Sequence, residues 1–77
     1  MNMRQQKRVL KQLRYNIIRV GMGVNTKILL QDSDILINSE LLSTPILRDV
    51  VNICDREGLM YYVTTTNKSY VVTVRIY

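Results

Sequence analysis

Six basic side chains and no acidic side chain occur within the first nineteen residues of the chain. They are Arg4, Lys7, Arg8, Lys11, Arg14 and Arg19. Residues 20–77 carry five basic and six acidic groups, so the formal net charge of +5 belongs to the first segment. A polyanion would relieve the repulsion between these like charges, and nucleic-acid phosphates are the obvious candidate. The residues predicted to bind nucleic acid are Arg4, Lys7, Arg8, Lys11 and Arg14.

The basic segment also permits other roles, which the sequence leaves open. It could occupy an acidic surface of another protein, lie on an anionic membrane, or serve solubility alone. The chain has no helix-turn-helix spacing, zinc-ligand pattern or RNP-like aromatic motif, so binding of nucleic acid should depend only weakly on base sequence. The competing class of protein is an interaction module, such as a small inhibitor or adaptor.

Residue types that commonly perform catalysis are scarce. The chain has no histidine, and its single cysteine, Cys54, falls within an apolar helical stripe, as a structural thiol does. The cluster Asp32-Ser33-Asp34 lacks the later oxygen ligands of a calcium loop, and Gly21-Met22-Gly23 lacks the third glycine of a dinucleotide fingerprint. We therefore expect no catalytic residues, no metal, no cofactor and no small-molecule substrate.

The length and composition predict one small globular domain over residues 1–77. Apolar residues make up 47% of the 77 residues, which is enough for a core. Domains below about 80 residues rarely gain more than about 3–5 kcal/mol from one core, so we expect a homo-oligomer. The unpaired Cys54 and the lack of a long apolar run or signal-peptide pattern favour a cytoplasmic protein without a membrane span.

The basic residues are predicted to lie on an amphipathic helix over residues 3–20. Its apolar residues recur at helical spacing and should face the core. They are Met3, Val9, Leu10, Leu13 and Ile17. Gly21 would end the helix, because glycine accepts a left-handed backbone conformation. The β-branched residues within 15–22 leave a strand as the alternative for that stretch.

A hairpin should follow, formed by strands Thr26–Gln31 and Asp34–Ser39 around a turn at Asp32-Ser33. With a two-residue turn, Ile28 lies opposite Ile37 and Leu30 lies opposite Ile35. These four side chains share one face of the hairpin, which should face the core.

A second helix is predicted between Thr44 and Gly58, with Thr44 as N-cap, Pro45 in the first turn and Gly58 at the C-terminal end. Its apolar stripe also recurs at helical spacing. It consists of Ile46, Leu47, Val50, Val51, Ile53 and Cys54.

A second hairpin should close the fold, with strands over residues 59–66 and 69–76 and a turn at Asn67-Lys68. This register places Tyr61 opposite Val74 and Val63 opposite Val72. A three-residue turn would exchange the faces of the first strand.

The predicted fold is therefore α+β in the order αββαββ, with a four-stranded antiparallel sheet and two helices on one face. The two halves align with a shift of 37 residues, which leaves an internal duplication open. Two helices cannot cover both sheet faces, so the other face should form the interface between copies. The predicted interface residues are Leu29, Leu36, Met60, Tyr62, Val71, Arg75 and Tyr77. Stacking of nucleotide bases on the tyrosines and Arg75 is the alternative.

Overall fold

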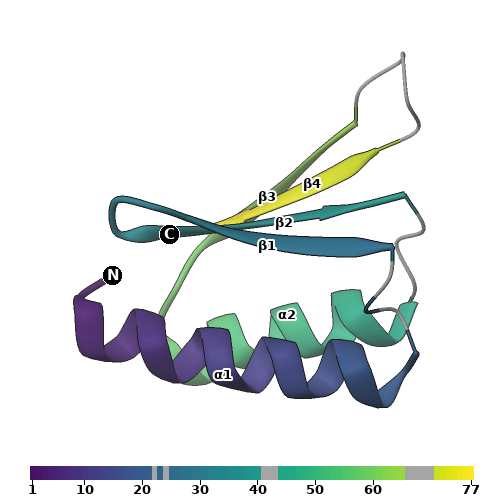
Figure 1. Cartoon of the computed structure of the whole chain (residues 1–77). Helices are drawn as coiled ribbons and strands as arrows, with labels where there is room; N and C mark the ends of the chain where they lie inside the picture. Colours follow the sequence, from purple (N-terminus) through teal and green to yellow (C-terminus); the bar gives the residue numbers. More distant parts are fainter. Residues whose placement is uncertain (22, 24, 41–43, 66–70) are drawn as a thin grey trace.

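The computed structural model describes residues 1–77 except for 22, 24, 41–43 and 66–70. Its elements are α1 (Met3–Arg19), β1 (Thr26–Gln31), β2 (Asp34–Ser39), α2 (Thr44–Glu57), β3 (Tyr61–Thr65) and β4 (Val72–Ile76). The strands form one antiparallel sheet in the order β1-β2-β4-β3, and both helices cover the same face of it (Figure 1). The predicted α+β class, with two helices and a four-stranded antiparallel sheet, is confirmed. Neither helix, within the described chain, is long and apolar enough to cross a membrane.

Helix α1 has a residue that favours a helix terminus at each end. The side-chain oxygen of Asn2 accepts a hydrogen bond from the backbone N–H of Gln5 at 2.7 Å. Gly21 follows the helix with φ +75°, a conformation that costs glycine little. Since the helix continues to Arg19 and a turn follows at residues 20 and 21, the alternative of a strand is wrong for residues 15–21.

The buried side of α1 contains an unexpected polar residue. Val9, Leu13 and Ile17 are buried as predicted, but Met3 is 70% exposed and is not part of the core. Gln6 takes the place at the start of the buried stripe, and its Nε2 donates to the carbonyl oxygens of Asp32 at 3.0 Å and Asp34 at 3.1 Å. Gln6 therefore fastens α1 to the turn of the first hairpin.

The first hairpin has the predicted register. Ile28 pairs with Ile37 and Leu30 pairs with Ile35 across β1 and β2. The turn lies at Asp32 and Ser33, and Asp32 adopts φ +55°, which aspartate tolerates better than most residues.

The second hairpin has a different register from the predicted one. Tyr61 pairs with Ile76 and Val63 pairs with Val74, a displacement of two residues. Because side chains alternate with period two, this displacement leaves every side chain on its predicted face. Backbone bonds between Met60 and Tyr77, at 2.8 and 2.9 Å, extend the pairing beyond the strands. The predicted turn at Asn67-Lys68 lies outside the described residues.

The core lies between the helices and the two central strands. Ile35 and Ile37 of β2 and Val74 and Ile76 of β4 are all fully buried. From α2 the core receives four residues: Ile46, Val50, Ile53 and Cys54. Burial raises the pKa of the Cys54 thiol, which fits an unreactive core residue.

The ends of α2 follow the predicted pattern with one small difference. Thr44 is the first residue of the helix instead of the residue that precedes it, a one-residue difference of the kind common at helix ends. At the other end, Gly58 adopts φ +69° and turns the chain toward β3.

Candidate nucleic-acid interface

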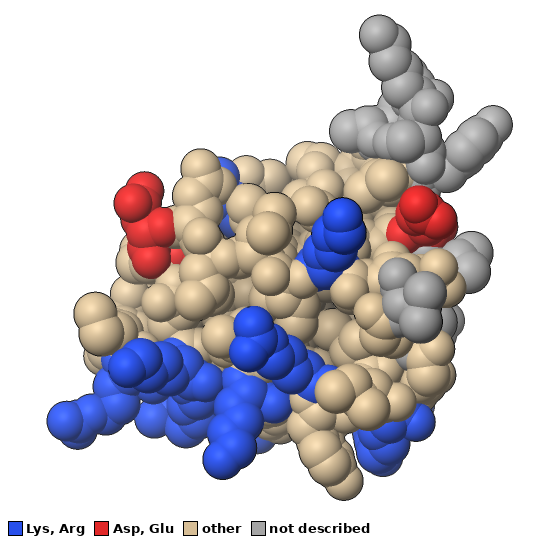
Figure 2. All heavy atoms as spheres, viewed as in Figure 1, with Lys and Arg blue, Asp and Glu red and all other residues tan. Residues whose placement is uncertain are grey.

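The outward side of α1 carries a set of exposed cations. Since Gln6, Val9 and Leu13 face the core, the residues on the other side of the helix point to solvent. All six basic residues of α1 are exposed, and four of the predicted ones, Arg4, Lys7, Lys11 and Arg14, form no ion pair with the described acidic residues. We call these four residues the basic face. Figure 2 shows Lys and Arg side chains gathered along the edge of the molecule where α1 lies.

The length of the basic face suits a phosphate backbone. From Arg4 to Arg14 the helix rises about 15 Å, at 1.5 Å per residue. One strand of B-form DNA presents about four phosphates over that distance, at 3.4 Å per nucleotide. Long, flexible side chains can therefore reach several phosphates at once without any change in the helix.

Arg8, the fifth predicted cation, has a different environment. Its Nε donates to Glu57 Oε1 at 2.8 Å and its Nη2 donates to Glu57 Oε2 at 2.6 Å. Gln5 Nε2 also donates to Glu57, to Oε2 at 3.2 Å and to the backbone oxygen at 2.9 Å. Arg8 thus joins α1 to the end of α2, and its charge is compensated by a carboxylate. We do not count it in the basic face.

The contact with Arg8 predicts a specific acid sensitivity. The hydrogen bonds from Arg8 and Gln5 lower the pKa of Glu57 from its ordinary 4.5 to about 2. A carboxyl group whose pKa is lower in the folded state stabilises the fold above its unfolded pKa, and this contribution is lost as the pH falls toward the folded value. We expect the melting temperature of the wild type to fall more steeply between pH 4.5 and about 2 than that of Glu57→Gln. Parallel profiles from thermal melts would contradict the ion pair.

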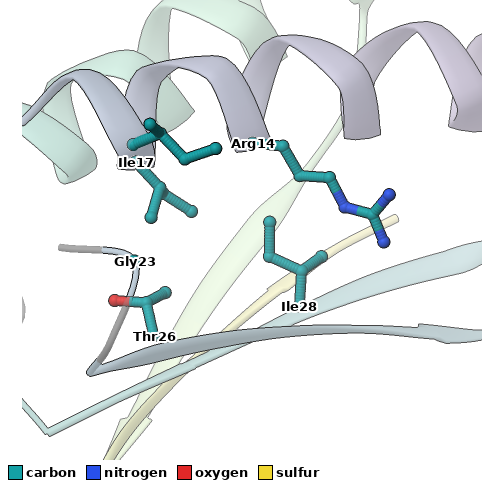
Figure 3. Close-up of a pocket in the computed structure, with 6 residues that line it drawn as sticks. Arg14, Ile17, Gly23, Thr26 and Ile28 are labelled. Carbon is teal, nitrogen blue, oxygen red and sulfur yellow. The ribbon is translucent and has the colours of Figure 1, made fainter. Parts of the chain in front are cut away.

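Beside the basic face, a hollow of about 250 Å³ lies between α1 and β1. It is lined by Arg14, Ile17, Ile18, Gly23, Thr26 and Ile28. Figure 3 shows Arg14 reaching from α1 toward β1, while Ile28 points back toward the helix. The walls are mainly aliphatic, and the Thr26 hydroxyl is within 3.1 Å of the Ser39 hydroxyl. The hollow therefore offers apolar contact and one guanidinium, without a fixed set of groups that could read a base edge.

The predicted interface residues lie on the sheet face opposite the helices. Strand pairing places Leu29, Leu36, Arg75 and Tyr62 in one row across all four strands. The exposed fractions are 48% for Leu29 and 44% for Tyr62, and Arg75 is half-buried. We call this side of the sheet the open face.

Polar contacts divide the open face. Arg75 Nε donates to Asp34 Oδ2 at 2.7 Å, so an ion pair joins the two central strands near the turn of the first hairpin. Next to it, the rings of Tyr62 and Tyr77 meet edge to face with centroids 5.9 Å apart. Met60 is exposed at the same end of the sheet. Arg75 is therefore engaged by a carboxylate, which makes it a poor platform for stacking bases.

Val71, the remaining predicted interface residue, is half-buried at the other end of the open face. It lines a second hollow, of about 270 Å³, with Asn25, Lys27, Asn38 and Glu40. Charges of both signs line this hollow, so it does not extend the apolar part of the face.

The basic face belongs to the helix layer, and the open face is the side of the sheet that the helices do not cover. The two surfaces therefore lie on opposite sides of the molecule (Figure 1). A single short ligand cannot contact both. The sequence predicted both sets of residues, but it gave no sign of Gln5, Glu57 and Asp34, whose partners are far away along the chain.

No protein-family model matches the chain, and no curated protein is significantly similar to it. Within the described residues, no group of three or more cysteine, aspartate or glutamate side chains could hold a metal ion.

Proposed function

We propose that the protein is a small, non-catalytic nucleic-acid-associated protein that binds phosphate backbones through the basic face. The observation that carries this proposal is the exposure of Arg4, Lys7, Lys11 and Arg14 on one side of α1, a helix without an acidic residue. The Glu57 carboxylate, which contacts α1, is already paired with Arg8. The four cations are left to bind an external anion.

Binding through this surface depends little on base sequence. Phosphate contacts position a protein on nucleic acid, whereas hydrogen bonds to base edges give sequence preference. Lysine and arginine side chains on an exposed helix supply the first kind of contact, and the hollow next to Arg14 supplies only apolar contact to a base or sugar. Affinity should therefore come mainly from counterion release.

The second candidate function is that of a protein-interaction module. It is favoured by the exposed apolar side chains of the open face, among them Leu29, Met60 and Tyr62. An acidic protein surface could also bind the basic face. In either case we place the protein in a reducing cytoplasm, which suits the buried thiol of Cys54.

Fluorescence anisotropy with three labelled probes separates the two functions. The probes are random-sequence single-stranded RNA, random-sequence duplex DNA and a polyglutamate peptide of matched charge. The proposed function predicts binding to both nucleic acids without a preferred sequence. It also predicts weaker binding to the peptide than to duplex DNA, because an extended peptide carries one charge per about 3.4 Å, against about 1.7 Å for the duplex. Binding to none of the probes, or to polyglutamate alone, would support the interaction module instead.

A further inference from the structure

Strand β3 is an edge of the sheet whose outer backbone groups face away from the protein. Met60 and Tyr77 exchange two backbone hydrogen bonds. The N–H and C=O groups of Met60 therefore point toward the strand that contains β4. In an antiparallel ladder this direction alternates from residue to residue. Tyr61, Val63 and Thr65 therefore direct their N–H and C=O groups outward, ready to pair with another strand.

The composition of β3 does nothing to prevent such pairing. Natural edge strands are usually protected by a lysine, a proline or a bulge. The five residues of β3 are Tyr61, Tyr62, Val63, Thr64 and Thr65, all uncharged and all favourable in strands. All five are exposed, which shows that no described part of the chain covers the edge.

The helix side of β3 is uncovered as well. Tyr61 and Val63 point to the side of the sheet that carries the helices, yet they are 38% and 43% exposed. Figure 1 shows β3 running away from the helix layer along its length, so α2 covers only its beginning. A further strand at this edge would bury apolar surface in addition to forming hydrogen bonds.

The other edge of the sheet, β1, is unsuited to pair with its own copy. Helix α1 packs against β1 and β2, whereas α2 is the helix that contacts β3. Two β1 strands side by side would bring together two copies of the basic face, and Lys27 adds a charge on the strand itself. Pairing through β3 would place the two α1 helices at the far ends of the assembly, where their repulsion is least.

Stacking of two copies on the open face is also unfavourable. On that face Arg75 lies between Leu36 and Tyr62 and forms an ion pair with Asp34, the first residue of β2. Face-to-face stacking would remove both charged groups from water, and this desolvation offsets much of the gain from apolar burial. Edge pairing leaves the ion pair at the surface.

We infer that β3 pairs antiparallel with β3 of a second copy, across a twofold axis at Val63. In this register Val63 lies opposite Val63 of the second copy, and Tyr61 lies opposite its Thr65. These residues are the ones with outward backbone groups, so each pair exchanges both hydrogen bonds. On the open face Tyr62 lies opposite Thr64. No charged residues meet, and the two sheets become one continuous sheet with all helices on the same side.

Sedimentation equilibrium with three lysine variants tests the inference. Val63→Lys brings two ammonium groups together at the axis and should convert the dimer into a monomer with an unchanged circular dichroism spectrum. Leu30→Lys is the matched control, because Leu30 is also an exposed, helix-side residue of an edge strand, on β1. Leu29→Lys places the same charge on the open face. Both controls should remain dimeric.

A monomeric wild type at hundreds of micromolar would overturn the inference, as would a dimer that Leu29→Lys or Leu30→Lys breaks and Val63→Lys does not. Hydrogen exchange of the wild type tests the pairing of β3 even if Val63→Lys fails to fold. Pairing predicts that the amides of Tyr61, Val63 and Thr65 become protected as the protein concentration rises. Unprotected exchange of these three amides at high concentration would contradict it. Neither measurement depends on nucleic-acid binding, so the proposed dimer and the proposed function are tested independently.

Discussion

Replacement of all four residues of the basic face by glutamate is expected to abolish polyanion binding and to leave the circular dichroism spectrum unchanged. The variant carries Arg4→Glu, Lys7→Glu, Lys11→Glu and Arg14→Glu. All four side chains are exposed on α1, so their replacement removes no core contact. The reversed charges would repel phosphates at the surface where the wild type attracts them. Electrophoretic mobility shift with random-sequence RNA and DNA measures the loss.

A control variant reverses two exposed cations elsewhere. Lys27→Glu combined with Arg48→Glu changes charge on β1 and α2 and should leave most of the affinity in place. Arg8→Glu should behave differently from both, because it places a carboxylate against Glu57 and lowers stability. Retained binding in the fourfold variant would show that the basic face is not the polyanion-binding surface. Loss of its fold would show that these side chains are packed.

Ile37→Ala is expected to leave the chain largely unfolded. Ile37 is 0% exposed and lies between Ile28 and Val74 on the helix side of the sheet. Truncation of a buried isoleucine to alanine costs about 2–5 kcal/mol. A domain of this size gains only about 3–5 kcal/mol from its core, so the substitution removes most of its stability.

The control for Ile37→Ala is Leu29→Ala, on the other face of the sheet. Leu29 is 48% exposed, and its truncation should cost less than about 1 kcal/mol. Urea denaturation followed by circular dichroism compares the two variants. Equal losses of stability would contradict the assignment of faces, on which the positions of the helices and of the open face depend.

Local patterns were sufficient to predict most of the fold. The 3.6-residue period of Val9, Leu13 and Ile17 defined the buried side of α1, and the short Asp32-Ser33 turn fixed the register of β1 and β2. The register of β3 and β4 was predicted incorrectly by two residues. A displacement of two keeps the same faces, so hydrophobic alternation cannot detect it, and only the turn length could have done so.

The candidate site was predictable to the extent that it follows from helical periodicity. Once Val9 and Leu13 face the core, the exposure of Lys7 and Lys11 follows. The pairing of Arg8 with Glu57, 49 residues away, depends on how α1 and α2 pack and leaves no local signal. The pairing of Arg75 with Asp34, 41 residues apart, depends likewise on the order of strands in the sheet.

The salt dependence of nucleic-acid affinity tests most directly the claim that the basic face binds phosphates. With about four phosphate contacts, the slope of log K against log salt concentration on duplex DNA should be about −3 to −4. Lys11→Ala should reduce the magnitude of this slope by about one, because it removes one contact. Arg48→Ala, which removes an exposed cation from α2, should leave the slope unchanged. A slope near zero, or a slope that Arg48→Ala reduces as much as Lys11→Ala does, would contradict the account.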